Sequence, residues 1–156
     1  SRNVHKTYLA VVKGEFPEGE QDITLPIGRD RHDARRMHVS KTGKAALTHV
    51  RRLEVQRRGQ SMRSLMLAEL GTGRKHQIRV HFSALGFPIV GDGLYGPIAR
   101  DSMYGRAPST RTAAFTQASL MLHAYELSFV HPVTGESLVL KTEWPSRFTG
   151  WSVQNP

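Results

Sequence analysis

One stretch of the chain concentrates residues that could bind an anion. The segment from Glu69 to His81 reads ELGTGRKHQIRVH and holds two glycines, three basic side chains and two histidines. A strand is predicted before its Gly-Thr-Gly and a helix after it, so backbone N–H groups and the positive end of the helix dipole would meet at this turn. Arg74 and Lys75 add positive charge at the same place. The combination indicates a site for phosphate or another anion.

Arg79 lies one helical turn further in, beside Ile78, whose face is expected to pack on the core. An arginine in that setting is partly desolvated and therefore requires an anionic partner. One interpretation gives Arg79 a catalytic role. The other makes it a structural arginine paired with an internal carboxylate, and from the residues alone this second interpretation is at least as well supported.

Several other chemistries are disfavoured by the sequence. The Gly-x-x-x-x-Gly-Lys-Ser/Thr pattern of a P-loop is absent, and so is the Gly-x-Ser-x-Gly elbow of serine hydrolases. The chain has no cysteine, which excludes disulfides and thiolate catalysis. His76 and His81 are five residues apart and do not share a helix face, and no acidic residue at suitable spacing completes a ligand set. We therefore expect no metal site.

Composition points to a polyanionic partner without proving one. The 156 residues fit one domain, and 22 Lys+Arg against 13 Asp+Glu give a net charge of +9. Such an excess favours nucleic acid, although a basic but inert surface agrees with it equally well. No run of about 18 apolar residues is present, so no membrane span is predicted.

The pattern of apolar and turn residues predicts an α+β fold, with a mixed, mostly antiparallel sheet and flanking helices and loops. A helix of about three turns is predicted from His76, because Ile78, Phe82 and Leu85 recur at helical spacing and Gly86 and Pro88 end the run. The polar segment 28–36 and the segment 97–117 are expected to be loops. The predicted strands are Lys6–Val12, an extended Asp22–Ile27, the hairpin Thr48–Val55 and Ser64–Leu70 around a connection at 57–61, Met121–Val130 and Ser137–Thr142.

These motifs resemble the RluA-type RNA pseudouridine synthases. The run GTGRKHQIRVH, followed by ALGFPIVGDGLYG, is similar to the signature of that family. Further blocks match in the expected order: KTYLAVVKG near the N-terminus, LPIGRD and GKA in the middle, and LHA and HPVTGE near the C-terminus. Because the resemblance covers nearly the whole chain in separate blocks, it is more specific than any single motif.

The resemblance implies an enzyme that isomerises uridine to pseudouridine in ribosomal or transfer RNA, with no cofactor and no metal. The target uridine is flipped into a pocket, where an aspartate attacks the nucleoside. Tyr8 matches the tyrosine that stacks on the uracil, Arg79 the arginine that pairs with the catalytic aspartate, and Ile78 an apolar position lining the base pocket. The residues that we expect to contact RNA phosphates are Arg29, Arg31, Arg35, Arg36, Arg74 and Lys75.

The sequence departs from the family at one essential position. The nucleophile of the family lies in a His-Arg-Leu-Asp motif upstream of the tyrosine block, and this chain has no Leu-Asp pair. We therefore expect residues 1–156 to be the C-terminal portion of one catalytic domain, inactive alone and completed by an N-terminal half that carries the aspartate. The alternative is a non-catalytic RNA-binding or ribosome-assembly factor on the same scaffold. The expected location is the cytoplasm, with an organelle as the alternative.

Overall fold

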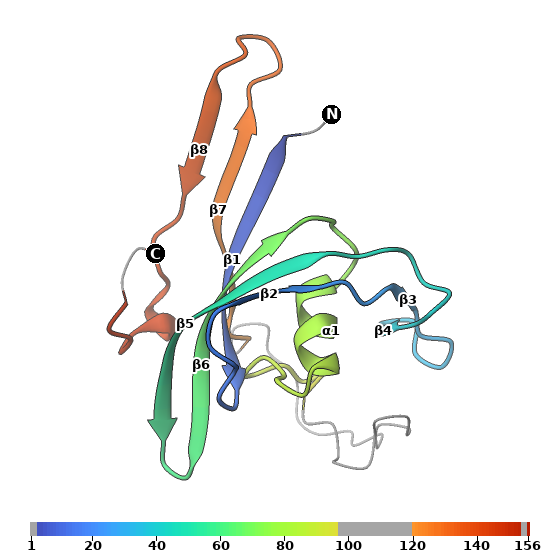
Figure 1. The fold of residues 1–156 in the computed structure, drawn as a ribbon, viewed down its shortest axis with the longest axis vertical. Coiled ribbons are helices and arrows are strands. Elements are labelled where there is room, and N and C mark those ends of the chain that lie inside the picture. The colour runs from blue at the N-terminus through green and yellow to red at the C-terminus, as the bar shows by residue number, and fades with distance from the viewer. Residues whose placement is uncertain (1–2, 97–119, 154–155) are drawn as a thin grey trace.

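The structure, a computed structural model, describes residues 3–96, 120–153 and 156. A six-stranded antiparallel sheet runs in the order β2-β5-β6-β1-β7-β8, and β3 and β4 form a separate two-stranded sheet (Figure 1). The predicted α+β class is confirmed. The elements are β1 Val4–Lys13, β2 Glu20–Ile23, β3 Ile27–Arg29, β4 Met37–Val39, β5 Thr48–Arg58, β6 Ser61–Leu70, α1 Gln77–Ala84, β7 Leu122–Val130, β8 Ser137–Lys141 and a 3-10 helix at Ser146–Phe148.

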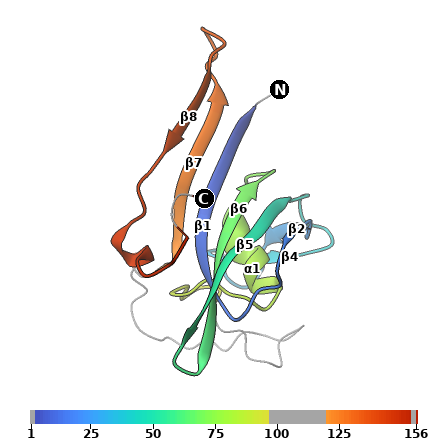
Figure 2. The ribbon, with the colours of Figure 1, turned by 60° about the vertical axis from the view of Figure 1, so that its left-hand side comes forward.

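The sheet is covered on both faces because successive side chains of a strand point to opposite sides. In β1, Ala10 and Val12 belong to the cluster beneath α1, whereas Leu9 and Val11 belong to a second cluster on the other face. That second cluster is closed by the C-terminal segment, which contributes Phe148 and Trp151. Figure 2 shows α1 and the C-terminal segment on opposite sides of the long strands.

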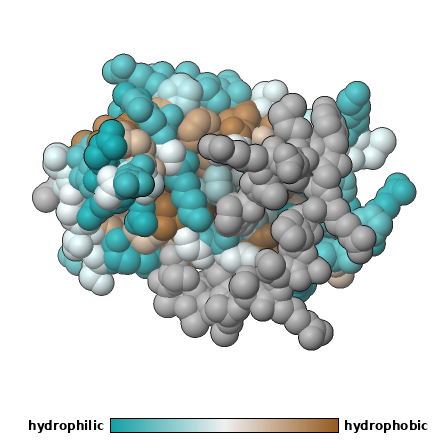
Figure 3. All heavy atoms as spheres, turned by 90° about the horizontal axis from the view of Figure 1, so that it is seen from below, coloured by the Kyte–Doolittle hydropathy of each residue, from teal (hydrophilic) through white to brown (hydrophobic). Residues whose placement is uncertain are grey.

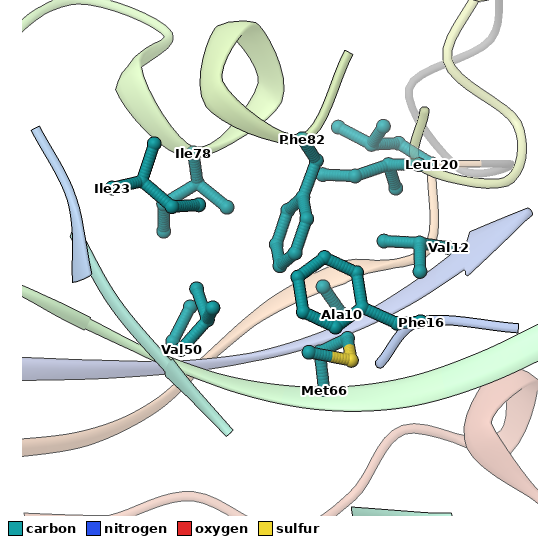
Figure 4. Close-up of a cluster of buried hydrophobic side chains, with 11 residues drawn as sticks. Ala10, Val12, Phe16, Ile23, Val50, Met66, Ile78, Phe82 and Leu120 are labelled. Carbon is teal, nitrogen blue, oxygen red and sulfur yellow. The ribbon is translucent and has the colours of Figure 1, made fainter. Parts of the chain in front are cut away.

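Helix α1 is anchored to the sheet by two side chains four residues apart. Ile78 and Phe82 both point from the helix toward the strands (Figure 4), as expected for neighbours on one helical face. The ring of Phe82 meets that of Phe16 edge-on, with centroids 5.8 Å apart. The predicted apolar spacing is confirmed, but the helix has 8 residues, about two turns rather than three. It begins only at Gln77 because His76 adopts a left-handed backbone conformation, with φ 56°.

Three further predicted bounds were wrong. The extended segment Asp22–Ile27 is divided, because β2 ends at Ile23 and β3 begins at Ile27 in the other sheet. The segment 57–61 was expected to connect two strands, but the strands continue and leave only Gly59 and Gln60 as the turn. Gly59 supplies the positive φ, 62°, that favours glycine at the first position of such a turn. The segment 28–36 is only partly a loop, because Ile27–Arg29 pairs with Met37–Val39 as a small hairpin.

The surface of the molecule is of mixed hydropathy. On the face shown in Figure 3, hydrophobic residues lie among hydrophilic ones. Among the residues that the structure describes, no helix has the length and apolar composition needed to cross a membrane. The segment 97–117, predicted to be a loop, lies outside the described residues.

Candidate functional site

The centre of the site is an ion pair between Arg79 on α1 and Asp92 in the turn that follows it. Arg79 donates from Nε to Oδ2 of Asp92 at 2.8 Å and from Nη2 to Oδ1 at 2.9 Å, which is a bidentate geometry. The Arg79 side chain is 12% exposed and that of Asp92 is fully buried. The anionic partner that the setting of Arg79 requires is therefore present within this chain, and the role of Arg79 toward a nucleophile rests on the family resemblance.

Asp92 also shapes its own turn. Its Oδ1 accepts hydrogen bonds from the backbone N–H groups of Leu94 and Tyr95, at 3.0 and 2.9 Å. Burial raises the pKa of this carboxyl, but the hydrogen bonds from Arg79, Tyr95 and Leu94 outweigh burial and hold the pKa below its ordinary value. Gly96 closes the turn so tightly that a Cβ there would lie 2.3 Å from the carbonyl oxygen of Asp92. The sequence predicted Asp92 only as a turn residue. Its pairing with Arg79, 13 residues away, could not be seen in the sequence because nothing local indicates it.

Each of the four described aspartates is engaged by neighbouring groups. Asp92 is buried with its oxygens occupied. Asp22 is on the edge strand β2 with His49 at 2.6 Å. Asp30 and Asp33 accept hydrogen bonds from backbone N–H groups of their own loop, and Arg35 helps to lower the pKa of Asp33 to about 2. Asp101 lies outside the described residues.

A chain of hydrogen bonds fixes the start of α1. Gln77 Nε2 donates to Thr48 Oγ1 at 2.9 Å, and Thr48 Oγ1 lies 2.8 Å from His81 Nδ1. The other ring nitrogen of His81 lies 2.8 Å from the carbonyl oxygen of Leu25, so the network is consistent with a neutral ring that donates from Nε2. Burial lowers the pKa of His81, which favours this neutral form. His81 is therefore a packing residue that ties α1 to β5 and to the chain before β3.

The glycine-rich turn is less open than the sequence suggested. The backbone N–H of Arg74 donates to Gln77 Oε1 at 3.0 Å, so it does not face outward as a donor. The Arg74 side chain is half-buried and its Nε donates to the carbonyl oxygen of Ala45. Lys75 is exposed. Of the two cations predicted here, Lys75 is the one with the more open side chain.

Tyr8 and Ile78 lie on the same face of the sheet. Ile78 is a member of the cluster beneath α1, and Tyr8, half-buried on β1, packs against that cluster. The pairing of β1 with β7 shifts register between Thr7 and Tyr8, because β7 carries an extra residue, Tyr125, at that point. Such a bulge bends the strand that carries it, and bulges are frequent beside active sites. This irregularity could not be seen in the sequence, because the extra residue sits in an apparently regular strand.

The basic residues of segment 28–36 divide into two groups. Arg29, Arg31 and Arg35 are exposed, and Arg35 also pairs with Asp33 at 2.7 Å. Arg36 instead turns inward, with 28% of its side chain exposed and its guanidinium carbon 5.3 Å from the centre of the Tyr95 ring. The guanidinium carbon of Arg79 lies 5.0 Å from the same ring. The structure thus brings the basic hairpin and Arg79 to a common residue, Tyr95, which sequence reasoning did not select.

No metal-binding group is evident in the described ranges, since no three His, Asp or Glu side chains there lie close enough to hold an ion. His76 contacts the hydroxyl of Tyr95 at 2.8 Å. Burial, together with the charges of Arg79 and Lys75, lowers the pKa of His76. What the described residues offer is a guanidinium fixed by Asp92, a half-buried Tyr8 and an exposed basic hairpin.

Comparison with known proteins identifies this arrangement. The RNA pseudouridylate synthase family matches residues 1–84. An uncharacterised RNA pseudouridine synthase of Bacillus subtilis is 39% identical over 93% of this chain and 42% of its own length. A ribosomal large subunit pseudouridine synthase D of Nitrosomonas europaea is 38% identical over 92% of this chain and 39% of its own length. This chain thus spans less than half the length of these curated relatives.

A solved structure agrees in fold. The human RNA pseudouridylate synthase domain containing 1 superposes with a TM-score of 0.71 at 32% identity, over 91% of this chain and 55% of that one. This superposition covers more of the chain than residues 1–84. The chain therefore belongs to the RluA-type RNA pseudouridine synthase family and covers part of its catalytic domain.

Proposed function

We propose that this chain is the C-terminal portion of an RNA pseudouridine synthase, and that a nucleophilic aspartate from outside these 156 residues completes its active site. The observation that supports this most directly is Arg79 on α1, which is held in place by the two hydrogen bonds that it donates to Asp92. A guanidinium fixed in this way can bind a second carboxylate or a developing negative charge without reorganising. The engaged state of the four described aspartates supports an external nucleophile.

In the proposed reaction the target uridine is flipped out of the RNA and its base lies against Tyr8 and Ile78. The aspartate attacks C1′ of the nucleoside, and the bond between uracil N1 and C1′ breaks. The detached uracil rotates, and its C5 bonds to C1′ as the bond between C1′ and the aspartate breaks and frees the carboxylate. The proton on C5 is then removed with the help of Tyr8, and N1 gains a proton. Arg79 pairs with the aspartate throughout.

The proposed substrate is ribosomal or transfer RNA. A relative whose name assigns it to the ribosomal large subunit favours ribosomal RNA. The exposed Arg29, Arg31, Arg35 and Lys75, with the half-buried Arg74, are the proposed phosphate contacts. Arg36 stays in the proposed set, but its guanidinium faces Tyr95 and contributes to holding the hairpin.

The experiment compares the complete gene product that contains this chain with the 156-residue chain alone. Each is incubated with ribosomal and transfer RNA, and pseudouridine is counted by mass spectrometry of the digested nucleosides. We expect modification by the complete product and none by the chain alone. Arg79→Ala in the complete product should lower the rate at least about 100-fold, the scale of one charge-stabilising group in an active site.

Arg51→Ala is a matched control for that substitution. Arg51 also pairs with an acidic side chain, Glu20, but it is 43% exposed on β5. The Arg51→Ala substitution should leave the rate of modification nearly unchanged. Full activity of the Arg79→Ala protein would contradict the role assigned to Arg79.

A second candidate is a non-catalytic RNA-binding or ribosome-assembly factor. The lack of a Leu-Asp pair and the net charge of +9 favour it. It predicts salt-sensitive RNA binding by the complete gene product, with no gain of pseudouridine. The coding sequence upstream of Ser1 separates the two candidates, because only a synthase requires a Leu-Asp motif there.

A further inference from the structure

Tyr95 lies at the junction of the basic hairpin and α1. It is 4% exposed and belongs to a small cluster with Ile27 of β3 and Val80 of α1. Met37 of β4 packs against that cluster. Tyr95 is thus surrounded by the two elements that carry the proposed RNA contacts and Arg79.

The hydroxyl of Tyr95 connects those elements by hydrogen bonds. It accepts the backbone N–H of Met37 at 2.8 Å, and it lies 2.8 Å from Nδ1 of His76. Because the lowered pKa of His76 favours the neutral ring, the single hydroxyl proton is available for Nδ1. One oxygen atom therefore holds both β4 and the residue immediately before α1.

The ring of Tyr95 holds two cations. The guanidinium carbons of Arg36 and Arg79 lie 5.3 and 5.0 Å from its centre, within the range of cation–π attraction. Arg36 comes from the hairpin loop and Arg79 from the helix. The same turn holds Arg79 a second time through Asp92, whose carboxylate also accepts the backbone N–H of Tyr95. A movement of the hairpin would therefore displace the ring of Tyr95, and the ring contacts the guanidinium of Arg79.

We propose that Tyr95 is a positioning residue that couples the basic hairpin β3–β4 to Arg79, so that RNA held by the hairpin lies at a fixed position relative to Arg79 and the aspartate that pairs with it. The proposal rests on the proposed function for its substrate, RNA. The two contacts of Tyr95 do not depend on that function: its hydroxyl sets the position of the hairpin, and its ring sets the orientation of Arg79.

Two substitutions in the complete gene product separate these roles. Tyr95→Phe removes the hydroxyl and keeps the ring, so it should raise KM for RNA about tenfold, the equivalent of one net hydrogen bond, with kcat within about twofold. Tyr95→Leu removes the ring as well and should also lower kcat, by about tenfold or more. A residue that only fills space would lower the melting temperature without this division between KM and kcat.

Tyr125→Phe is the matched control. Tyr125 is 3% exposed on β7, belongs to the cluster on the other face of the sheet, and has a cation, Lys141, near its ring. It should leave KM and kcat unchanged. If wild-type protein neither binds nor modifies RNA, the proposed function fails. If wild-type protein modifies RNA and Tyr95→Phe gives the same KM as Tyr125→Phe, only the coupling role fails.

A further variant covers the case in which Tyr95→Phe does not fold. His76→Ala leaves Tyr95 in place and removes the acceptor of its hydroxyl. It should raise KM for RNA about threefold, since the hydrogen bond from Met37 remains. An unchanged KM in His76→Ala would overturn the proposal.

Discussion

The pair of Arg79 and Asp92 contributes little net stability, but the loss of either partner should destabilise the fold, because it would leave a buried charge unpaired. Removing both charges from water opposes folding, and the bidentate contact and the backbone N–H groups on Asp92 offset that penalty. The net stability of the pair is therefore small. Its value is geometric, because a guanidinium held at two nitrogens has little freedom to move. The structural and catalytic interpretations of Arg79 are compatible: the carboxylate of Asp92 is what fixes the group that would act.

Asp92→Asn should destabilise the fold strongly. The change removes a fully buried negative charge and leaves the Arg79 guanidinium without its counter-charge, for a loss of about 3–5 kcal/mol in the free energy of unfolding. Urea denaturation of the wild-type and variant proteins measures this. The double variant Arg79→Met with Asp92→Leu should recover part of the loss, since neither charge is then left unpaired. A loss below about 1 kcal/mol for Asp92→Asn would contradict the assigned role.

At the scale of elements, the hairpin β3–β4 presents exposed cations next to the helix that carries Arg79. Arg29→Ala combined with Arg31→Ala should weaken RNA binding and reduce the dependence of log K on log salt by about 0.7 to 0.9 for each phosphate that the variant no longer neutralises. Filter binding at several salt concentrations gives both quantities. Arg51→Ala with Lys141→Ala removes the same charge from β5 and β8 and should change both quantities less. Equal effects would show that only net charge matters.

The C-terminal segment covers the face of the sheet opposite α1. Phe148 is 1% exposed and packs with Leu9, Val11 and Leu65. Phe148→Ala should lower the free energy of unfolding by about 3–5 kcal/mol, the usual cost of truncating a buried aromatic side chain. Val133→Ala is the matched control, because Val133 is 87% exposed and its truncation should change little. Thermal and chemical denaturation measure both, and a Phe148→Ala protein as stable as wild type would show that this face stays covered without the segment.

At the scale of the whole molecule, the spacing of apolar residues in the sequence predicted which side chains of the helix are buried. The four-residue spacing of Ile78 and Phe82 placed the buried face of the helix correctly, because burial follows the helical period directly. Contacts between residues far apart in sequence were not predictable. Nothing local indicates that Tyr95 meets Met37, or that β1 and β7 shift register at Tyr8. Tyr8 was selected from the family resemblance and Arg79 from its setting on the predicted helix as well, whereas Asp92 and Tyr95 required the folded chain.

The free energy of unfolding depends on pH through histidines in several parts of the molecule, and these histidines change it in opposite directions. Burial lowers the pKa of His76, His81 and His123, so the unfolded chain binds more protons than the folded one as pH falls through about 6.5. Each of these histidines therefore removes stability on acidification. His49 acts in the opposite sense, because its hydrogen bond to Asp22 raises its pKa. Its side chain is 38% exposed, so solvent screening reduces its effect.

The free energy of unfolding should accordingly fall between pH 7.5 and 5.5, a range in which carboxylates with ordinary pKa values are ionised in both states. Each histidine that stays neutral in the folded protein contributes a slope of up to about 1.4 kcal/mol per pH unit. Denaturant titrations at several pH values measure this slope. His81→Gln should lower stability at pH 7.5 and flatten the slope, because Gln does not titrate, whereas His49→Gln should steepen it. A protein that gains stability toward pH 5.5 would show that the exposed pair of His49 and Asp22 outweighs the three histidines whose pKa values are lowered.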